Sequence, residues 1–259
     1  MYIVTYQDDL KGGKMKKCII AVLLFLTAAA PLSAEVRVKH HTHTDAYYYG
    51  GTTTPEVNRD YEIWLGEGKI ALVEENTKMI FDVTDSILIF INSSDSIYLE
   101  TKMPLAWTDV IVEEEVGRIQ MYQYTGEMKD LGEKKEIEGH DCAAHMLTTW
   151  IPYQDVKYNE GDNVTWYTED VPFDLAVYRK AFPCVLALRN YNSELIELLG
   201  EGKGYPMRSE ETRFQKGIEI KTVTTVEDIS EMDAPDGLWG VPEGYEKKDR
   251  ITIQELQGS

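Results

Sequence analysis

Polar and apolar residues alternate in short runs through residues 35–103, and tight turns separate these runs. In residues 59–65, Tyr61, Ile63 and Leu65 alternate against the charged residues Arg59, Asp60 and Glu62 until a Gly-Glu-Gly turn ends the run. Alternation with a period of two is typical of strands that have one buried face. Because turn residues recur at intervals of roughly 8–12 residues, the pattern predicts an antiparallel meander.

Residues 87–91 depart from this alternation, because all five are apolar. A strand that is apolar on both faces has to be covered on both. Helices can provide this cover, and in a half-closed barrel a bound ligand can also provide it. The residue pattern alone leaves both alternatives open.

The hydrophobic period changes in the second half of the chain. Phe173, Val177 and Ala181 recur at helical spacing behind Pro172, which suits the first turn of a helix. A second helical piece is expected within residues 185–199. Further strands are predicted over residues 118–124, 140–150, 164–168, 208–214 and 218–226. Strands interrupted by helices predict a mainly β (α+β) fold, a curved antiparallel sheet with helices laid on one face.

Residues 15–34 have the layout of a secretory signal peptide. Two lysines form a basic start, residues 18–26 are apolar, and a looser segment leads to a cleavage point after Ala34. The apolar run is too short to span a bilayer, which takes about 20 apolar residues. The sequence therefore predicts a periplasmic protein with no stable membrane span after cleavage.

The predicted signal peptide divides the chain into four parts. Residues 1–14 are interpreted as an over-long start or a leader, and residues 15–34 as the signal peptide. Residues 35–245 are expected to form a single domain. Residues 246–259 are expected to be a loose polar tail.

Charge excludes one class of partner. Cleavage after Ala34 would remove four lysines and two aspartates, so Lys+Arg falls from 26 to 22 and Asp+Glu from 45 to 43. The net charge then changes from −19 to −21. Such a chain is repelled by phosphate backbones and anionic lipid surfaces, and no basic stripe offsets this repulsion. Binding to nucleic acid is therefore not expected.

Two cysteines, Cys142 and Cys184, would remain after cleavage. In an oxidising compartment they are a candidate disulfide, worth roughly 4 kcal/mol in the loop-entropy model. The alternative is a pair of buried free thiols that pack as small apolar groups. The sequence leaves both alternatives open.

His41, His43 and Asp45 are the candidate metal ligands. They fall on one face of the first predicted strand, and imidazole with carboxylate suits Zn²⁺ or Cu²⁺. However, no residues that would orient these ligands can be recognised. A polar edge strand explains the same residues, so no metal site is predicted.

Catalytic candidates are equally sparse. His140 and His145 flank Cys142, but a residue two positions along a strand is a side neighbour and no oxyanion-hole motif accompanies them. The acidic residues 113–115 are interpreted as a solvated run, and Glu169 with Asp170 as helix-capping groups. The protein is therefore predicted not to be an enzyme and not to use a cofactor.

Three short segments resemble a family of exported bacterial proteins of unknown function. Residues 139–145 resemble its G-x-x-C strand, residues 166–172 its W-x-T-D/E-x-x-P segment, and residues 236–245 its F-x-V-P-x-G-Y ending. The family is related to the periplasmic lipoprotein-carrier (Lol-type) half-barrels and to the GLPGLI proteins. The GLPGLI signature itself is absent, since residues 182–186 stand at its place.

The resemblance spans roughly residues 36–245 and implies a fold. That fold is an incomplete antiparallel β-barrel, a half-barrel, with helices covering its concave face. Such concavities in related proteins hold acyl chains or other apolar ligands. The resemblance does not imply catalysis.

Together these observations favour a non-catalytic protein that binds or carries a hydrophobic ligand, either a lipid or an acylated envelope lipoprotein. One alternative is a structural or interaction protein of the envelope without a small-molecule ligand. A lower alternative is a metal-binding protein that uses His41 and His43. The residues predicted to line the ligand cavity are Leu88, Phe90, Ile97, Leu99, Phe173 and Val177.

Overall fold

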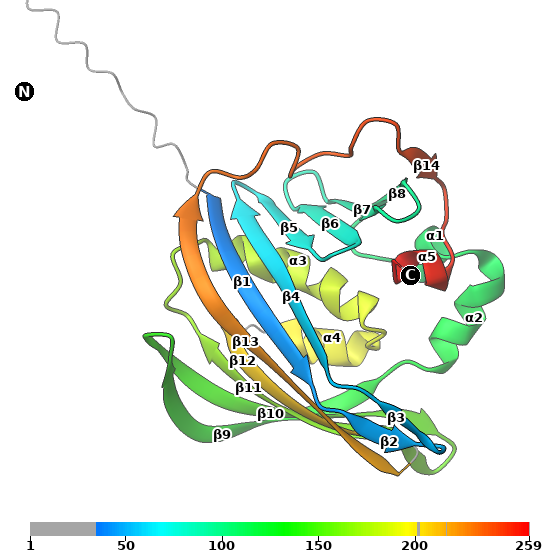
Figure 1. Ribbon diagram of the computed structural model, residues 1–259, viewed down its shortest axis with the longest axis vertical. Coiled ribbons are helices and arrows are strands. Elements are labelled where there is room, and N and C mark those ends of the chain that lie inside the picture. Colours follow the sequence, from blue (N-terminus) through cyan, green and yellow to red (C-terminus); the bar gives the residue numbers. More distant parts are fainter. Residues whose placement is uncertain (1–34, 201–202, 216, 259) are drawn as a thin grey trace, which may run out of the picture. The chain divides into compact units, whose positions relative to one another are not determined.

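Figure 1 shows the computed structural model, which describes residues 35–200, 203–215 and 217–258. The predicted signal peptide over residues 15–34 lies outside the described residues. All described residues belong to one compact unit. The fold is mainly β, with a large curved sheet and a few helices, as the hydrophobic pattern predicts.

Twelve strands form one open sheet that does not close into a barrel. They are β1 (Glu35–Thr44), β4 (Val57–Gly66), β5 (Lys69–Val73), β6 (Thr77–Asp82), β7 (Ile87–Asn92), β8 (Ile97–Lys102), β9 (Thr125–Ile137), β10 (His140–Tyr153), β11 (Val156–Thr168), β12 (Tyr205–Gln215), β13 (Ile218–Met232) and β14 (Glu246–Lys248). Their order is β14-β8-β7-β6-β5-β4-β1-β13-β12-β11-β10-β9. Strands β2 (Tyr47–Tyr49) and β3 (Thr52–Thr54) form a separate hairpin.

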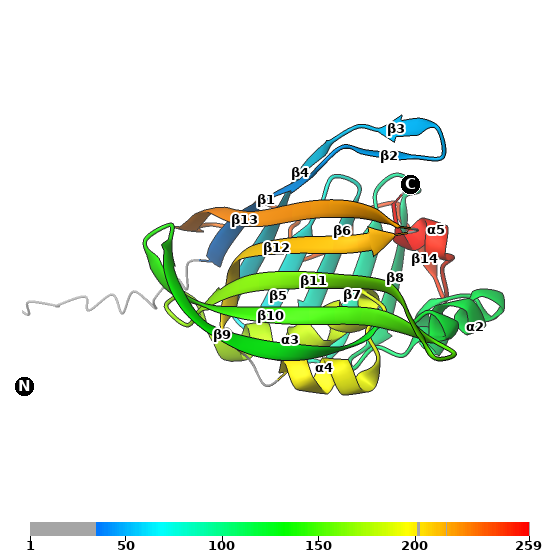
Figure 2. The same cartoon turned by 90° about the horizontal axis from the view of Figure 1, so that it is seen from below.

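Breaks in register bend the long strands. The pairing shifts between Lys39 and His40 on β1, between Trp166 and Tyr167 on β11, and at two places on β10. An extra residue in a ladder bends the strand and increases its twist. Figure 2 shows β9 to β13 curving across in front of β5 to β8.

Helices cover the concave face of the sheet (Figure 1). They are α1 (Trp107–Val110), α2 (Glu113–Met121), α3 (Leu175–Leu188), α4 (Ser193–Gly200) and α5 (Ile253–Leu256). Helix α3 begins at Leu175, later than predicted, and leaves Pro172 and Phe173 outside it, because Asp174 caps the helix by accepting a hydrogen bond from the Ala176 N–H at 2.8 Å. Tyr178 and Ala181 of α3 pack against the sheet in the largest core cluster.

The strand predicted over residues 118–124 is wrong, because residues 113–121 form α2. Three glutamates in the first turn favour a helix N-terminus, where the helix dipole attracts negative charge. One of them, Glu115, also accepts a hydrogen bond from the Ile253 N–H at 2.7 Å. Ile119 of α2 is buried against the strand cluster around Phe90. Tertiary contacts therefore decide this segment.

Residues 87–91, in β7, are covered on both faces, as their composition predicts. Leu88 and Phe90 point into the clusters under the helices. Ile89 and Ile91 point to the opposite face, where they pack in a separate cluster with Leu238. The cover on this outer face is residues 233–245, which we call the outer strap. Neither a helix nor a ligand is needed on that face.

Polar contacts fix the outer strap to the sheet. The Lys78 ammonium donates hydrogen bonds to the carbonyl oxygens of Gly237 and Gly240, both at 2.9 Å. The Glu35 carboxylate accepts from the Ala234 N–H at 3.2 Å and from the Trp239 indole N–H at 3.3 Å. The strap is thus held at both ends of its apolar contact.

Residues 246–258 differ from the expected loose tail. Strand β14 pairs in parallel with β8, which makes the sheet mixed, and Ile251 is fully buried. Thr252 and Glu255 form a capping box at the start of α5. The Thr-x-x-Glu spacing is a recognised signal for a helix start, so the sequence carried this information.

The outer strap generates a stability prediction. We expect Leu238→Ala to lower the free energy of unfolding by about 2–4 kcal/mol, because Leu238 is 6% exposed and its removal leaves a cavity. The measurement is equilibrium unfolding in urea. Val156→Ala is the control, since Val156 is 63% exposed and should change the free energy by less than about 0.5 kcal/mol. Equal midpoints for both variants would show that the strap does not pack on the sheet.

Candidate functional site

A cavity of about 1060 Å³ lies between α3 and the inner face of eight neighbouring strands, β6, β5, β4, β1, β13, β12, β11 and β10. Helix α3 contributes positions at helical spacing, so one face of the helix forms one wall. These are Tyr178, Ala181, Phe182, Val185, Leu186 and Arg189. The apolar part of the sheet wall consists of Ile63, Ile70, Leu72, Phe81, Leu147, Pro206 and Met207.

The six residues predicted to line a ligand cavity lie elsewhere. Leu88 packs in the core cluster under α3, and Phe90, Ile97 and Leu99 pack against α1, α2 and α5. Phe173 and Val177 are partly buried against the core, and Phe173 packs edge-on against the Tyr205 ring. None of the six is among the residues that line the cavity. Contact between these six and a ligand stays a prediction.

His40 is a titratable cavity residue that the sequence analysis did not single out, as are Arg189, Glu211 and Arg213. His40 is 3% exposed and lines the cavity. Its ring stacks on Tyr61 with centroids 4.5 Å apart, and its Nε2 is 2.8 Å from the Tyr205 hydroxyl. Burial, with a smaller effect from the positive charge of Arg189, lowers the pKa of His40 to about 3. His40 is therefore neutral at physiological pH.

The alternation of β1 could have identified this histidine. Val36, Val38 and His40 are all buried, because alternate residues of a strand face the same side. Of the three histidines on this strand, only His40 lies on the same face as Val36 and Val38. His41 and His43 belong to the opposite face.

The neutral state of His40 generates a pH prediction. Below its ordinary pKa of 6.5 the unfolded chain takes up a proton that the folded chain does not bind until about pH 3. Stability should therefore fall as pH decreases through this window, by at most about 1.4 kcal/mol per pH unit. We expect His40→Gln to remove this component, so that its stability depends less on pH than that of the wild type between pH 6.5 and 4.5.

Urea unfolding at several pH values in that window measures both slopes. The slope is informative even if His40→Gln is less stable at every pH, because loss of the Tyr61 stacking shifts the whole curve. Parallel curves for the two proteins would show that His40 is protonated in the folded state.

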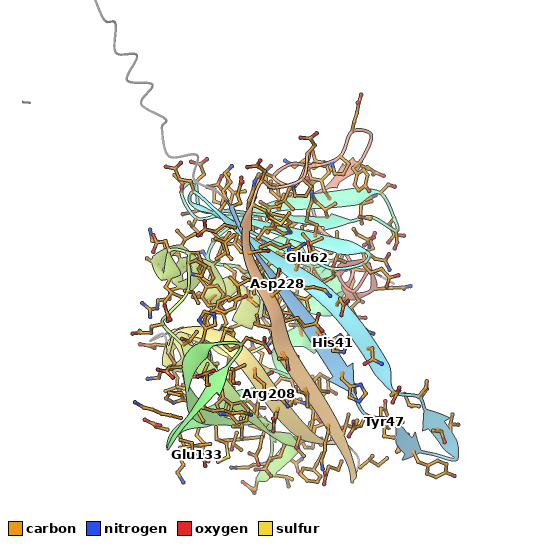
Figure 3. The ribbon with its side chains drawn as sticks, turned by 60° about the vertical axis from the view of Figure 1, so that its left-hand side comes forward. His41, Tyr47, Glu62, Glu133, Arg208 and Asp228 are labelled. Carbon is orange, nitrogen blue, oxygen red and sulfur yellow. The ribbon has the colours of Figure 1, made fainter. Side chains whose placement is uncertain are left out.

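His41 and His43 lie on the outer face of the sheet, and Figure 3 shows His41 on β1 with Glu62 and Asp228 on the flanking strands. The Nδ1 atom of His41 is 2.7 Å from Asp60, and that of His43 is 2.8 Å from the Asn58 side-chain oxygen. Across the residues that the structure describes, no group of three His, Cys, Asp or Glu side chains is placed to hold a metal ion.

Cys142 and Cys184 are both free and buried, which is the second of the two alternatives left open by the sequence. Burial raises the pKa of both thiols. The Cys142 thiol donates to the backbone carbonyl of His140 at 3.4 Å, while the His140 ring lies 4.0 Å from Asp170. A buried thiol with a raised pKa is a poor nucleophile.

A partly buried ion pair lies at the polar end of the cavity. Arg213 and Glu211, both on β12, pair through the Arg213 Nε at 2.9 Å from the Glu211 carboxylate. The Arg213 guanidinium also lies over the Tyr124 ring, 4.8 Å from its centroid. Since each charge has a partner, this pair adds polarity to the cavity but little net charge.

Comparison with known proteins gives little help. No family model and no curated protein matches the chain. A solved structure with some likeness is the "putative outer membrane lipoprotein-sorting protein domain" from Vibrio parahaemolyticus, with 8% sequence identity and a TM-score of 0.21. The alignment covers 78% of this chain and 87% of that chain. At this TM-score we base no inference on the likeness.

Membership of the family that the three short motifs resemble therefore stays a prediction. None of the helices in the described part of the chain combines the length and hydropathy needed to cross a bilayer.

Proposed function

We propose that this protein is a non-catalytic binding protein that holds an acyl-chain ligand, a lipid or the acyl part of a lipoprotein, in the cavity beside α3. The cavity is the observation that carries the proposal. Its volume of about 1060 Å³ is at the upper end of the range for small-molecule sites, about 300–1,000 Å³. In this proposal the protein works in the periplasm, as residues 15–34 predict.

The apolar walls supply the affinity in this proposal. Ile63, Leu72 and Phe81 on the sheet and Phe182 and Val185 on α3 all line the cavity. An acyl chain placed between such surfaces gains about 0.8 kcal/mol for each buried CH₂ group. A chain of a dozen carbons thus offers enough burial to offset the cost of immobilising the ligand.

The state of the polar groups fits binding better than catalysis. His40 is neutral and contacts the Tyr205 hydroxyl, and the Glu211 carboxylate is paired with Arg213. A general base needs a pKa near the working pH, and the lowered pKa of His40 is far from that range.

Filling the cavity tests the proposal. We expect Val185→Trp to weaken binding of a fluorescent fatty acid at least tenfold, because the indole occupies the space between α3 and the sheet. Ala176→Trp is the matched control, since Ala176 lies on the same helix, is exposed and is outside the cavity lining. Thermal melting of both variants checks that they fold.

Two results would contradict the proposal. One is a wild-type protein that contains no lipid by native mass spectrometry after gentle isolation and also fails to bind the probe. The other is equal loss of binding in both tryptophan variants, which would place the ligand elsewhere. A protein that is empty but captures an envelope protein would favour the interaction module instead.

A further inference from the structure

Strand register gives the cavity one apolar end and one polar end. On β1 and β4, Val38 pairs with Ile63, and two residues further along His40 pairs with Tyr61. The next inward position on β1, Thr42, pairs with Thr224 of β13 and shares a 2.9 Å hydroxyl contact with it. Every step of two residues along β1 in this direction therefore moves from apolar to polar side chains.

The same gradient crosses the neighbouring strands. On β12 the cavity-lining residues run from Met207 through Ser209 to Glu211. Ser209 pairs with Thr224 and Glu211 with Thr222, so the polar positions of β12 and β13 lie at one level. A site with segregated ends fits a molecule that has an apolar tail and a polar head.

Arg189 lies at the polar end. It is the C-cap residue of α3 and the last member of the face of α3 that lines the cavity. It keeps a large accessible surface, although burial is the largest single influence on its pKa. Both observations agree if the guanidinium stands in the cavity space, enclosed by the walls but not packed into them.

The charge of Arg189 has no carboxylate partner. Within the described part of the chain, its guanidinium makes no salt bridge and no side-chain hydrogen bond. Glu211 is the acidic group that influences it, and Glu211 is paired with Arg213. Burial opposes the charge on Arg189, but the hydroxyls of Tyr191 and Tyr61 together with Glu211 outweigh burial and raise its pKa. The cation therefore persists at any physiological pH.

An unpaired enclosed cation needs a counter-charge. The protein as a whole carries a formal net charge of −19, so its outer field repels anions. An anion that binds here has to be selected inside the cavity, by a guanidinium that offers five donors in a planar fork.

We infer that the ligand of the cavity is an anionic amphiphile, with an aliphatic tail against Ile63, Leu72 and Phe81 and a carboxylate or phosphate head bound by Arg189. This inference rests on the proposed function, since it names the chemical class of the ligand in the same cavity. It also gives the ligand an orientation, head towards the carboxyl end of α3.

A structural role for Arg189 is the competing explanation. A cation at a helix C-terminus is favoured by the helix dipole, whatever the cavity holds. That role predicts an effect on stability but no preference between charged and uncharged ligands. The two explanations are therefore distinguished by the ratio of the affinities of one protein for a charged and an uncharged ligand.

The experiment uses the purified protein, stripped of bound lipid, and titrates it with oleate, oleyl alcohol and oleoyl lysophosphatidic acid. These probes share one chain and differ in the head. We expect one or both anions to bind on the order of tenfold or more tighter than the alcohol, as for a charge-assisted hydrogen bond. The preference between oleate and the lysophospholipid tells whether the head is a carboxylate or a phosphate.

Variants then assign the preference to one residue. Arg189→Gln should bring the anions to the affinity of the alcohol, whereas Arg189→Lys should keep most of the preference. Arg179→Gln is the matched control, because Arg179 lies on the same helix, outside the cavity lining, and pairs with Glu169 at 3.1 Å. It should leave all three affinities unchanged.

The outcomes separate the two proposals. If all three probes bind equally, and Arg189→Gln changes none of them, the inference on Arg189 is overturned while the acyl-binding function stands. If none of the probes binds, both are overturned. Equal binding of the three probes by the wild type overturns the inference on Arg189 even if Arg189→Gln fails to fold.

Discussion

The structure depends on how much of a wide curved sheet one helix can cover. Neighbouring strands lie about 4.8 Å apart, so the eight strands that border the cavity span roughly 34 Å. An α-helix with its side chains is about 10–12 Å across. Helix α3 therefore covers less than half of that width. The rest of the inner surface must either collapse onto the helix or remain as a cavity.

Collapse is resisted at both sides of the cavity. Towards β7 and β8, the cluster of Phe90, Leu99 and Ile251 fills the concave face with α1, α2 and α5. Towards β9 and β10, Leu186, Leu195 and Leu199 tie α3 and α4 to the sheet. Because both flanks are solidly packed, the part of the sheet that α3 does not cover remains open as a cavity beside the helix. The cavity thus results from two well-packed hydrophobic clusters, one on each side of it.

The sequence allowed the fold to be predicted where a local pattern and tertiary packing agree. The apolar run of residues 87–91 predicted a strand covered on both faces, and β7 is covered by helices on one face and the outer strap on the other. The sequence could not reveal that the cover is an irregular segment 150 positions away along the chain (Ile89 to Trp239). Residues 118–121 alternate like a strand and yet are helical, because Ile119 is needed by the Phe90 cluster.

The candidate site was harder to predict, because its residues carry no motif. His40 and Arg189 both belong to periodic patterns that are visible in the sequence, the valine face of β1 and the apolar face of α3. In each case the site residue is the polar position at which an apolar pattern ends. Periodicity therefore indicated the two positions, but only the folded structure, in which His40 and Arg189 line one cavity, shows that they come together.

At position 189, packing along the apolar wall of α3 favours an apolar side chain, but the residue is an arginine. The preceding cavity positions on α3 are Tyr178, Ala181, Phe182, Val185 and Leu186, and a leucine at the next turn would extend that apolar wall. An enclosed charge without a partner costs free energy, even when tyrosine hydroxyls and cavity water solvate part of it. Real proteins break local packing rules mainly where function requires it. A site meant only for neutral chains would gain stability by replacing this arginine, whereas a site for charged amphiphiles needs it.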